Sequence, residues 1–452
     1  MRVEHKEGYE DRHGHDATMF GWPRRRRASA ALTVVSFVAF GVFAAALSPL
    51  FAQAPAIPKV EFDDAIKQAL DRNPTVGQAA TAIGRAESLL EQSRAATRFN
   101  ISASALNLTL DHSRGFEGLV TQPIDQATFG ANVTYPFLAF SRWAAVAQAK
   151  DQVDVAKFSV ADVRRAIAES AAEAYLAVIT AHRQVDVDER ALAAAQAHLD
   201  FAQKRLDAGA GSRVNQLRAA GEVSTDQSRL ETTRLGVLKA QEALGVLLVA
   251  GGPVDVGAEP SFDLPAGTSD QDISGRTDLQ LQIANQHAAE HVFKDSKKDW
   301  YPVASASFVP QIVEPAGLFQ PSKTWSLSIS LTQPIFTGGL QKALARERQI
   351  AVDFSKLAVA AVDNQAKSDV RVAEQSVQSY VRSSASARTA ADQANQVLQI
   401  TTTAFEVGAT TNIEVIDAQR SARDAETAAT QADDAVRRAR LDLLVALGKF
   451  PR

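Results

Sequence analysis

Two acidic residues, Glu414 and Asp417, are the side chains whose type and spacing most clearly suggest chemistry. They lie three residues apart, which places both carboxylates on one face of a helix. Carboxylates held close together attract cations and can line a selective passage for ions. The simpler alternative is a pair of acids on a solvated helix face, which is the usual setting of such residues.

No other grouping of side chains indicates a catalytic or metal site. His287 and His291 are spaced i, i+4, which suits a metal, but no third ligand accompanies them and a solvated helix face explains them better. The chain has no cysteine for thiolate sites, and its two methionines, Met1 and Met19, provide no path for soft metals. The sequence contains neither a glycine-rich phosphate loop nor a Ser/His/Asp grouping. We therefore expect neither enzyme activity nor a cofactor, and the net charge of −4 gives no reason to expect nucleic-acid binding.

Residues 1–54 have the anatomy of a signal peptide. Four arginines, Arg24 to Arg27, precede an apolar stretch at 28–52, and Ala52-Gln53-Ala54 has the small residues of a cleavage site. The alternative is an uncleaved membrane anchor, because the apolar stretch is long enough to cross about 30 Å of hydrocarbon. Residues 1–18 are polar, so Met19 is a second candidate for the start of translation.

The remainder of the chain is an internal duplication. Gly209 aligns with Gly408, and in each copy a long proline-free stretch leads to the glycine and a second one follows it. Because glycine tolerates the positive φ that ends a helix, we predict a sharp turn between antiparallel helices at both places. The predicted domains are a first structural repeat at 55–248, a linker at 249–276 and a second repeat at 277–452.

Each repeat also carries two segments with alternating apolar residues, which predict four β-strands per chain. They are 101–110, 129–137, 303–309 and 325–333, with loops predicted at 111–126 and 310–322. In the first strand Leu106, Leu108 and Leu110 alternate with Asn107 and Thr109. Segments of about ten residues are long enough to cross a bilayer when tilted, and aromatic residues lie near their ends. A soluble pair of hairpins is the alternative. Membrane-spanning strands must close into a barrel of about eight or more, so copies of this chain would have to share one.

The proline-free stretches predict very long helices. The stretch 141–206 would extend about 100 Å as a continuous helix. It carries a heptad seam of small residues at Val153, Ala156, Val160, Val163, Ile167, Ser170, Ala174, Ala177 and Ala181, and the second repeat has Ile350, Phe354, Leu357 and Ala361 at the same spacing. This seam is compatible with an isolated antiparallel coiled coil or with a larger helical barrel.

With these features in order, the mature chain resembles the TolC family of outer-membrane factors over about residues 60–450. The resemblance rests on the duplicated layout, Asn73-Pro74, Trp300-Tyr301-Pro302, the stretch 333–339 (Gln-Pro-Ile-Phe-Thr-Gly-Gly), and Val407-Gly408 followed by Ile413-Glu-Val-Ile-Asp-Ala418. It implies a mainly α fold with a membrane β-barrel portion: duplicated long antiparallel coiled-coil helices and four β-strands per chain. In a homotrimer these would form a 12-stranded barrel in the cell outer membrane on a 12-helix α-barrel in the periplasm.

The resemblance also assigns roles at the helical turns. Glu414 and Asp417 match carboxylates that line the narrow periplasmic entrance, and Phe405 matches an aromatic that helps to hold the tips closed. Thr410 stands where the best-known member has an arginine that bonds across the closed tip, so we expect another latch, with Arg213 and Glu406 as candidates. The tips around Leu206, Gly209, Val407 and Gly408 match the docking site of a periplasmic adaptor.

The expected function is that of a passive exit duct in a tripartite efflux pump for small molecules, gated at its periplasmic tips. Its expected partners are the adaptor, an inner-membrane transporter and outer-membrane lipid. An exit duct for type I protein secretion is the alternative within the family, because the fold is shared. A periplasmic coiled-coil scaffold without a pore is the alternative from another class.

Overall fold

The computed structural model describes residues 57–264 and 273–451. The predicted signal peptide at 1–54 lies outside these residues and stays a prediction. The chain divides into Met1–Pro55 and Ala56–Arg452, and all described residues belong to the second unit. Within the described residues, no helix combines the length and the apolar character that crossing a membrane requires.

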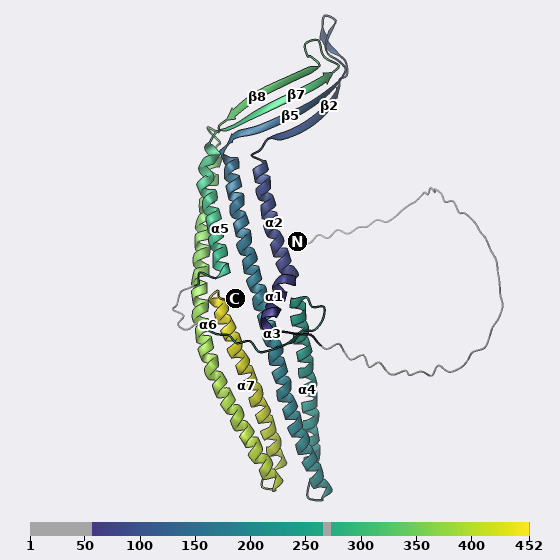
Figure 1. Ribbon diagram of the computed structural model, residues 1–452, viewed down its shortest axis with the longest axis vertical. Coiled ribbons are helices and arrows are strands. Elements are labelled where there is room, and N and C mark those ends of the chain that lie inside the picture. Colours follow the sequence, from purple (N-terminus) through teal and green to yellow (C-terminus); the bar gives the residue numbers. More distant parts are fainter. Residues whose placement is uncertain (1–56, 265–272, 452) are drawn as a thin grey trace, which may run out of the picture. The chain divides into compact units, whose positions relative to one another are not determined.

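Two long helical hairpins form most of this unit (Figure 1). The first consists of α3 (Phe140–Asp207) and α4 (Arg213–Leu248), and the second of α6 (Leu340–Glu406) and α7 (Asn412–Ala446). With 68 and 67 residues, α3 and α6 each extend about 100 Å. The prediction of very long helices is therefore confirmed, and the absence of internal proline explains why they are not interrupted.

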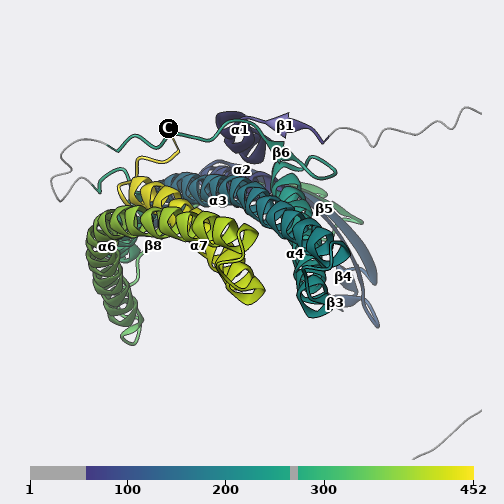
Figure 2. The same cartoon turned by 90° about the horizontal axis from the view of Figure 1, so that it is seen from below.

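Three shorter helices pack against the long ones. Helix α1 (Phe62–Arg72) ends at Asn73, which caps α2 (Pro74–Ala95) by accepting a hydrogen bond from the Thr75 amide at 2.9 Å. Helix α2 lies along α3, and α5 (Thr277–Lys294) contacts both α3 and α6. A short 3₁₀ helix, η1 (Asp295–Trp300), leads from α5 into the sheet. Seen end-on in Figure 2, the long helices form a curved layer rather than a closed bundle.

A four-stranded antiparallel sheet lies at the end of the long helices opposite the two hairpin turns, as Figure 1 shows. Its strands are β2 (Asn100–Thr109), β5 (Asp125–Ala139), β7 (Val303–Glu314) and β8 (Lys323–Thr332), in the order β2-β5-β7-β8. The pairing of β5 with β7 joins the two repeats. The four predicted strands are thus confirmed, and β2 and β8 are the free edges of the sheet within the chain.

Strand ends and loops differ from the prediction. Strand β7 continues through Pro310, where the sequence predicted a loop, because a proline removes only one donor and its ring still lies opposite Trp325. Strand β5 begins at Asp125 instead of 129. The predicted loop 111–126 contains a small hairpin of β3 (Arg114–Phe116) and β4 (Leu119–Gln122).

The two faces of the sheet differ in polarity. The pairing of Ala105 with Phe129, Val133 with Phe308 and Phe308 with Leu327 defines an apolar face. The opposite face is uncharged and rich in hydroxyl groups, with Ser102, Ser104, Asn132, Thr134, Ser305, Ser307, Ser328 and Ser330. Leu106 and Leu108 share one face opposite Asn107, as their alternation predicts. That face is the polar one, where they pair with Thr128 and Gln126, because Ile101, Ala103 and Ala105 form the apolar side of the strand.

The largest buried core lies midway along α3, around the fully buried Tyr175 and Leu176. The Tyr175 hydroxyl donates to the Ala258 carbonyl at 2.8 Å, next to the short parallel pair β1 (Lys59–Val60) and β6 (Asp255–Val256). Here the predicted seam on α3 fails, since Ser170 is exposed and Ala168, Ala171 and Ala172 are buried instead. Helices α1, α2, α5 and α7 all contact α3, so its buried side is not a single stripe.

Candidate functional site at the helical tips

Both hairpins reverse direction at a glycine with positive φ. Gly209 follows α3 with φ of 67°, and Gly408 follows α6 with φ of 82°, a region that other residues rarely adopt. Ser212 then caps α4, since its side-chain oxygen accepts from the Val214 amide at 3.2 Å. Thr411 and Glu414 form a capping box at the start of α7, in which the Thr411 amide donates to Glu414 Oε2 at 3.1 Å. The predicted sharp turns are confirmed at both tips.

The structure gives Glu414 a local role as a helix cap and leaves it exposed, as it does Asp417. Both carboxylates line one groove of 430 Å³ between α6 and α7, together with Thr410. Their predicted place on one helix face therefore holds. Whether they meet carboxylates of other copies in a constriction stays a prediction.

Phe405 is one of the residues that join the two hairpins. It is 6 % exposed, and its ring lies 5.1 Å from that of His198 and 5.6 Å from that of Phe201, both on α3. Arg205, in the last turn of α3, places its guanidinium 5.6 Å from the Phe405 ring centroid and donates to the Phe405 carbonyl at 3.2 Å. This aromatic and cationic cluster attaches the end of α6 to α3.

The other predicted tip residues lie at the surface. Arg213 is exposed as the first residue of α4, and within residues 57–264 and 273–451 it forms no ion pair with Glu406. Val407 is 78 % exposed on the second turn, with Gly408 exposed beside it. Leu206 is half-buried next to the exposed Gly209 on the first turn.

A buried polar pair lies beside Phe405. His198 Nε2 donates to Asn412 Oδ1 at 2.8 Å, and the two residues are 5 % and 3 % exposed. Burial lowers the pKa of His198 below its ordinary value of 6.5, although the hydrogen bond that the ring donates to Asn412 Oδ1 acts in the opposite direction. The imidazole is therefore neutral at neutral pH.

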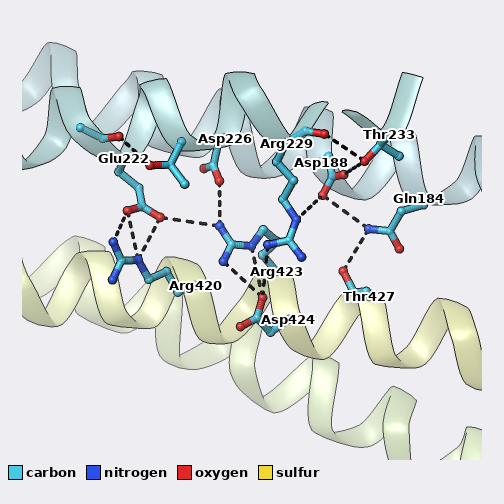
Figure 3. A network of polar contacts seen from close by, with 12 residues as sticks. Gln184, Asp188, Glu222, Asp226, Arg229, Thr233, Arg420, Arg423, Asp424 and Thr427 are labelled. Carbon is cyan, nitrogen blue, oxygen red and sulfur yellow. Dashed lines mark hydrogen bonds and ion pairs between the residues drawn. The ribbon is translucent and has the colours of Figure 1, made fainter. Parts of the chain in front are cut away.

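About two helical turns further from the tips, an ion-pair network joins α4 to α7 (Figure 3). Arg420 Nη2 lies 2.6 Å from Glu222 Oε2, and Arg423 Nη1 lies 2.7 Å from Asp226 Oδ1. Both acids are almost fully buried. Burial raises the pKa of Asp226, against the lowering effect of its hydrogen bond from Arg423.

The network continues onto α3 and brings all three helices together. Asp188 accepts from Thr233 on α4 at 2.6 Å and pairs with Arg229 at 3.5 Å, while Gln184 donates to Thr427 on α7 at 3.0 Å. Buried charges that lose their partner are costly, by about 3–5 kcal/mol, because the remaining charge stays out of water. Loss of the partner of a buried charge in this network would therefore destabilise the contact between the two hairpins.

The sequence did not predict this network, Arg205 or the pair His198–Asn412. No local signal identifies them, because their contacts join residues about 200 positions apart.

In the described residues, His287 and His291 do not form a metal-binding group with a third ligand. His291 Nδ1 lies 2.6 Å from Asp151 Oδ2, and His287 is exposed. Within the part of the chain that the structure describes, no group of three or more potential ligands could hold a metal.

Comparisons with known proteins agree with this architecture. The family model described as "Outer membrane efflux protein" matches residues 65–249 and 269–449. The outer membrane protein OprJ of Pseudomonas aeruginosa is 27% identical over 306 residues, which are 63% of this chain and 62% of OprJ. The chain thus matches less than two thirds of the length of this relative.

Solved structures share the fold at low sequence identity. The outer membrane protein VceC of Vibrio cholerae is 19% identical with a TM-score of 0.73, over 86% of this chain and 96% of VceC. The outer membrane channel CmeC of Campylobacter jejuni is 15% identical with a TM-score of 0.75, over 86% of this chain and 85% of CmeC. The resemblance to the TolC-like channels is confirmed, and the chain is an outer-membrane protein that belongs to the outer membrane efflux protein family.

Proposed function

We propose that three copies of this chain form a channel that serves as the exit duct of a tripartite efflux pump for small molecules. The observation that carries the proposal is the sheet. It has two free edges, β2 and β8, and a face of exposed apolar side chains such as Phe129, Trp325 and Leu327. Lipid cannot satisfy the backbone groups of a free edge, so such a sheet is stable in a membrane only when other copies close it. Three sheets of four strands make a barrel whose polar face lines the lumen.

Exposed apolar residues in the part of α6 nearer the sheet support the association of several copies of the chain. Ile350, Phe354 and Leu357, which carry the heptad seam, are 59 %, 73 % and 71 % exposed. Within the described chain, this apolar stripe faces no partner helix. A neighbouring copy that covers it would continue the curved layer of helices into a closed α-barrel.

The tips supply the proposed gate. The contacts of Phe405 and the network around Arg423 hold the second hairpin against the first in the closed channel. A periplasmic adaptor that binds the open arrangement better would shift the equilibrium toward an outward movement of the hairpins, and an inner-membrane transporter would deliver the substrate. With threefold symmetry, Glu414 and Asp417 would form two rings of carboxylates at the entrance.

Single-channel conductance in a planar bilayer tests this function. The mature protein in detergent is compared with the double variant Glu414→Ala/Asp417→Ala, with and without a trivalent cation. Asp64→Ala/Glu87→Ala is the control, because it removes two exposed carboxylates far from the tips. We expect a cation-selective pore that the trivalent ion blocks in wild type and control but not in the tip variant. A conducting pore with unchanged block would place the constriction elsewhere. A protein that stays in solution without detergent and never conducts would exclude the channel.

A further inference from the structure

A groove of 730 Å³ crosses the apolar face of the sheet. Its floor is a row of small side chains, in which Ala103 pairs with Ala131 and Pro310 continues the row on β7, opposite Trp325. Trp325 is 69 % exposed and lies at the end of the row, on the edge strand β8. The row runs across the strands rather than along one of them, so the register of the sheet creates the groove.

Larger apolar side chains border this row on both sides. Phe129 pairs with Ile312 on the side toward the loops, and Val133 pairs with Phe308 on the side toward the helices. Phe129, Phe308 and Ile312 line the groove and are exposed. A depression with apolar walls and a floor of small residues has the shape and polarity that suit a flexible hydrocarbon chain.

One cation lies where the groove meets the loop end of the sheet. Lys323, the first residue of β8, pairs with Ile312 and lines the groove. It is exposed, and within the described residues it forms no ion pair. Glu314, the nearest acid in the strand pairing, lies two residues beyond Ile312 and does not line the groove. Among the described residues that do line it, Lys323 alone is charged.

We propose that this groove binds a membrane lipid with a phosphate headgroup. One acyl chain would lie between the apolar walls, and the phosphate would contact Lys323. The inference rests on the proposed function, which turns the apolar face of the closed barrel toward lipid. Strand β8 leads toward α6, so its first residue lies at the outer border of the membrane, where a lysine can keep its ammonium group among the headgroups. A second copy of the chain would join at the strand edges and leave this face free.

The charge of Lys323 favours an anionic lipid over a zwitterionic one. A phosphate monoester attracts the ammonium group as a point charge, whereas the cation of a choline headgroup offsets that attraction. One lysine near a membrane surface contributes about fivefold to binding. A neutral lipid could fill the space between the walls, but it would leave the ammonium group of Lys323 unpaired.

Quenching of Trp325 fluorescence by brominated lipids tests this site. With Trp143→Phe and Trp300→Phe, Trp325 is the one tryptophan of the predicted mature chain. The full mature protein is reconstituted in phosphatidylcholine vesicles that contain increasing fractions of phosphatidic acid brominated close to the headgroup, or of phosphatidylcholine brominated in the same way. We expect the phosphatidic acid to bind about fivefold more strongly. Lys323→Gln should remove this preference, and Lys323→Arg should keep it.

Two further variants separate the groove from a general attraction to charge. Lys356→Gln removes an exposed lysine of α6, away from the sheet, and the preference should not change. Ala131→Leu fills the floor while Lys323 stays in place, and it should lower the preference. An equal loss in Lys356→Gln and Lys323→Gln, or a full preference in Ala131→Leu, would overturn the proposal. Millimolar inorganic phosphate that abolishes the preference at constant ionic strength would overturn it too, because Lys323 would then be a site for a free anion.

The same quenching separates this site from the proposed barrel. Equal quenching by both lipids would overturn the lipid site and leave the channel, since the apolar face would still contact hydrocarbon. No quenching by either lipid would contradict the membrane barrel as well.

Discussion

At the scale of single residues, the tip depends on a few side chains buried between two long hairpins. Phe405 contacts His198, Phe201 and Arg205, and all three come from α3. The position of Phe405 between the hairpins agrees with the latch role implied by the family resemblance, and that role stays a proposal. We expect this contact to depend on pH, because the imidazole of His198 is buried against the ring of Phe405.

We predict that acid weakens the closed tip. The pKa of His198 is lowered in the folded tip, so above its ordinary value of 6.5 the ring is neutral in both states and the contact is fully stable. As the pH falls below 6.5, the opened tip takes up a proton that the closed tip resists, and the closed state loses stability until its own pKa is reached. Hydrogen exchange of residues 405–412, corrected for intrinsic rates, should show less protection at about pH 5.5 than at about pH 7.5.

The loss of protection should not exceed about tenfold per pH unit, which is the limit for one proton. His198→Gln keeps a donor for Asn412 Oδ1 and cannot titrate, so its protection should not change over this range. An equal pH dependence in this variant would show that another group is responsible.

At the scale of elements, buried ion pairs join α4 to α7. We predict that Arg423→Ala opens the tips, because Asp226 remains buried without its hydrogen-bonded cation at a cost of about 3–5 kcal/mol, while Glu222 keeps only Arg420. The mean single-channel conductance should rise. A variant with Arg423→Met, Glu222→Gln and Asp226→Asn removes the buried charges together and should return toward the wild-type conductance.

Arg388→Ala is the matched control for this prediction. Arg388 Nη2 lies 2.9 Å from Asp433 Oδ2, but this ion pair joins α6 to α7 within one hairpin. Its loss should leave the separation of the two hairpins, and hence the conductance, unchanged. Equal increases in Arg388→Ala and Arg423→Ala would mean that loss of any ion pair loosens the helices, and the latch would be refuted.

The sequence predicts those elements that local chemistry determines. Asn73-Pro74 starts a helix, Gly209 and Gly408 end one, and long stretches without proline stay helical, because each effect involves neighbouring residues. The contacts of Arg205, His198 and Arg423 bring together residues about 200 positions apart, and only the packing of one repeat on the other determines them. The sheet face on which Leu106 and Leu108 lie could not be predicted for a related reason, since it depends on the register with β5.

At the scale of the whole molecule, the described chain has the features of one subunit in a closed assembly of several copies. The sheet ends at β2 and β8 with unpaired edges, and the apolar seam of α6 is uncovered. The wall that would line the barrel is uncharged, so selection by charge is expected at the tips rather than in the sheet. Association of several copies would pair the free strand edges and cover the apolar seam of α6, and the closed barrel would turn its apolar face to the lipid.

Cross-linking between the two edges tests this closure most directly. Ser104 on β2 and Ser328 on β8 lie on the same polar face, but within one chain three strand spacings, about 14 Å, separate the edges. With Ser104→Cys and Ser328→Cys in one otherwise cysteine-free chain, a short bismaleimide should join neighbouring copies. Closure predicts products of two and three chains and nothing larger, while neither single variant is cross-linked. Products within one chain only, or a ladder that continues beyond three chains, would contradict a closed trimeric barrel.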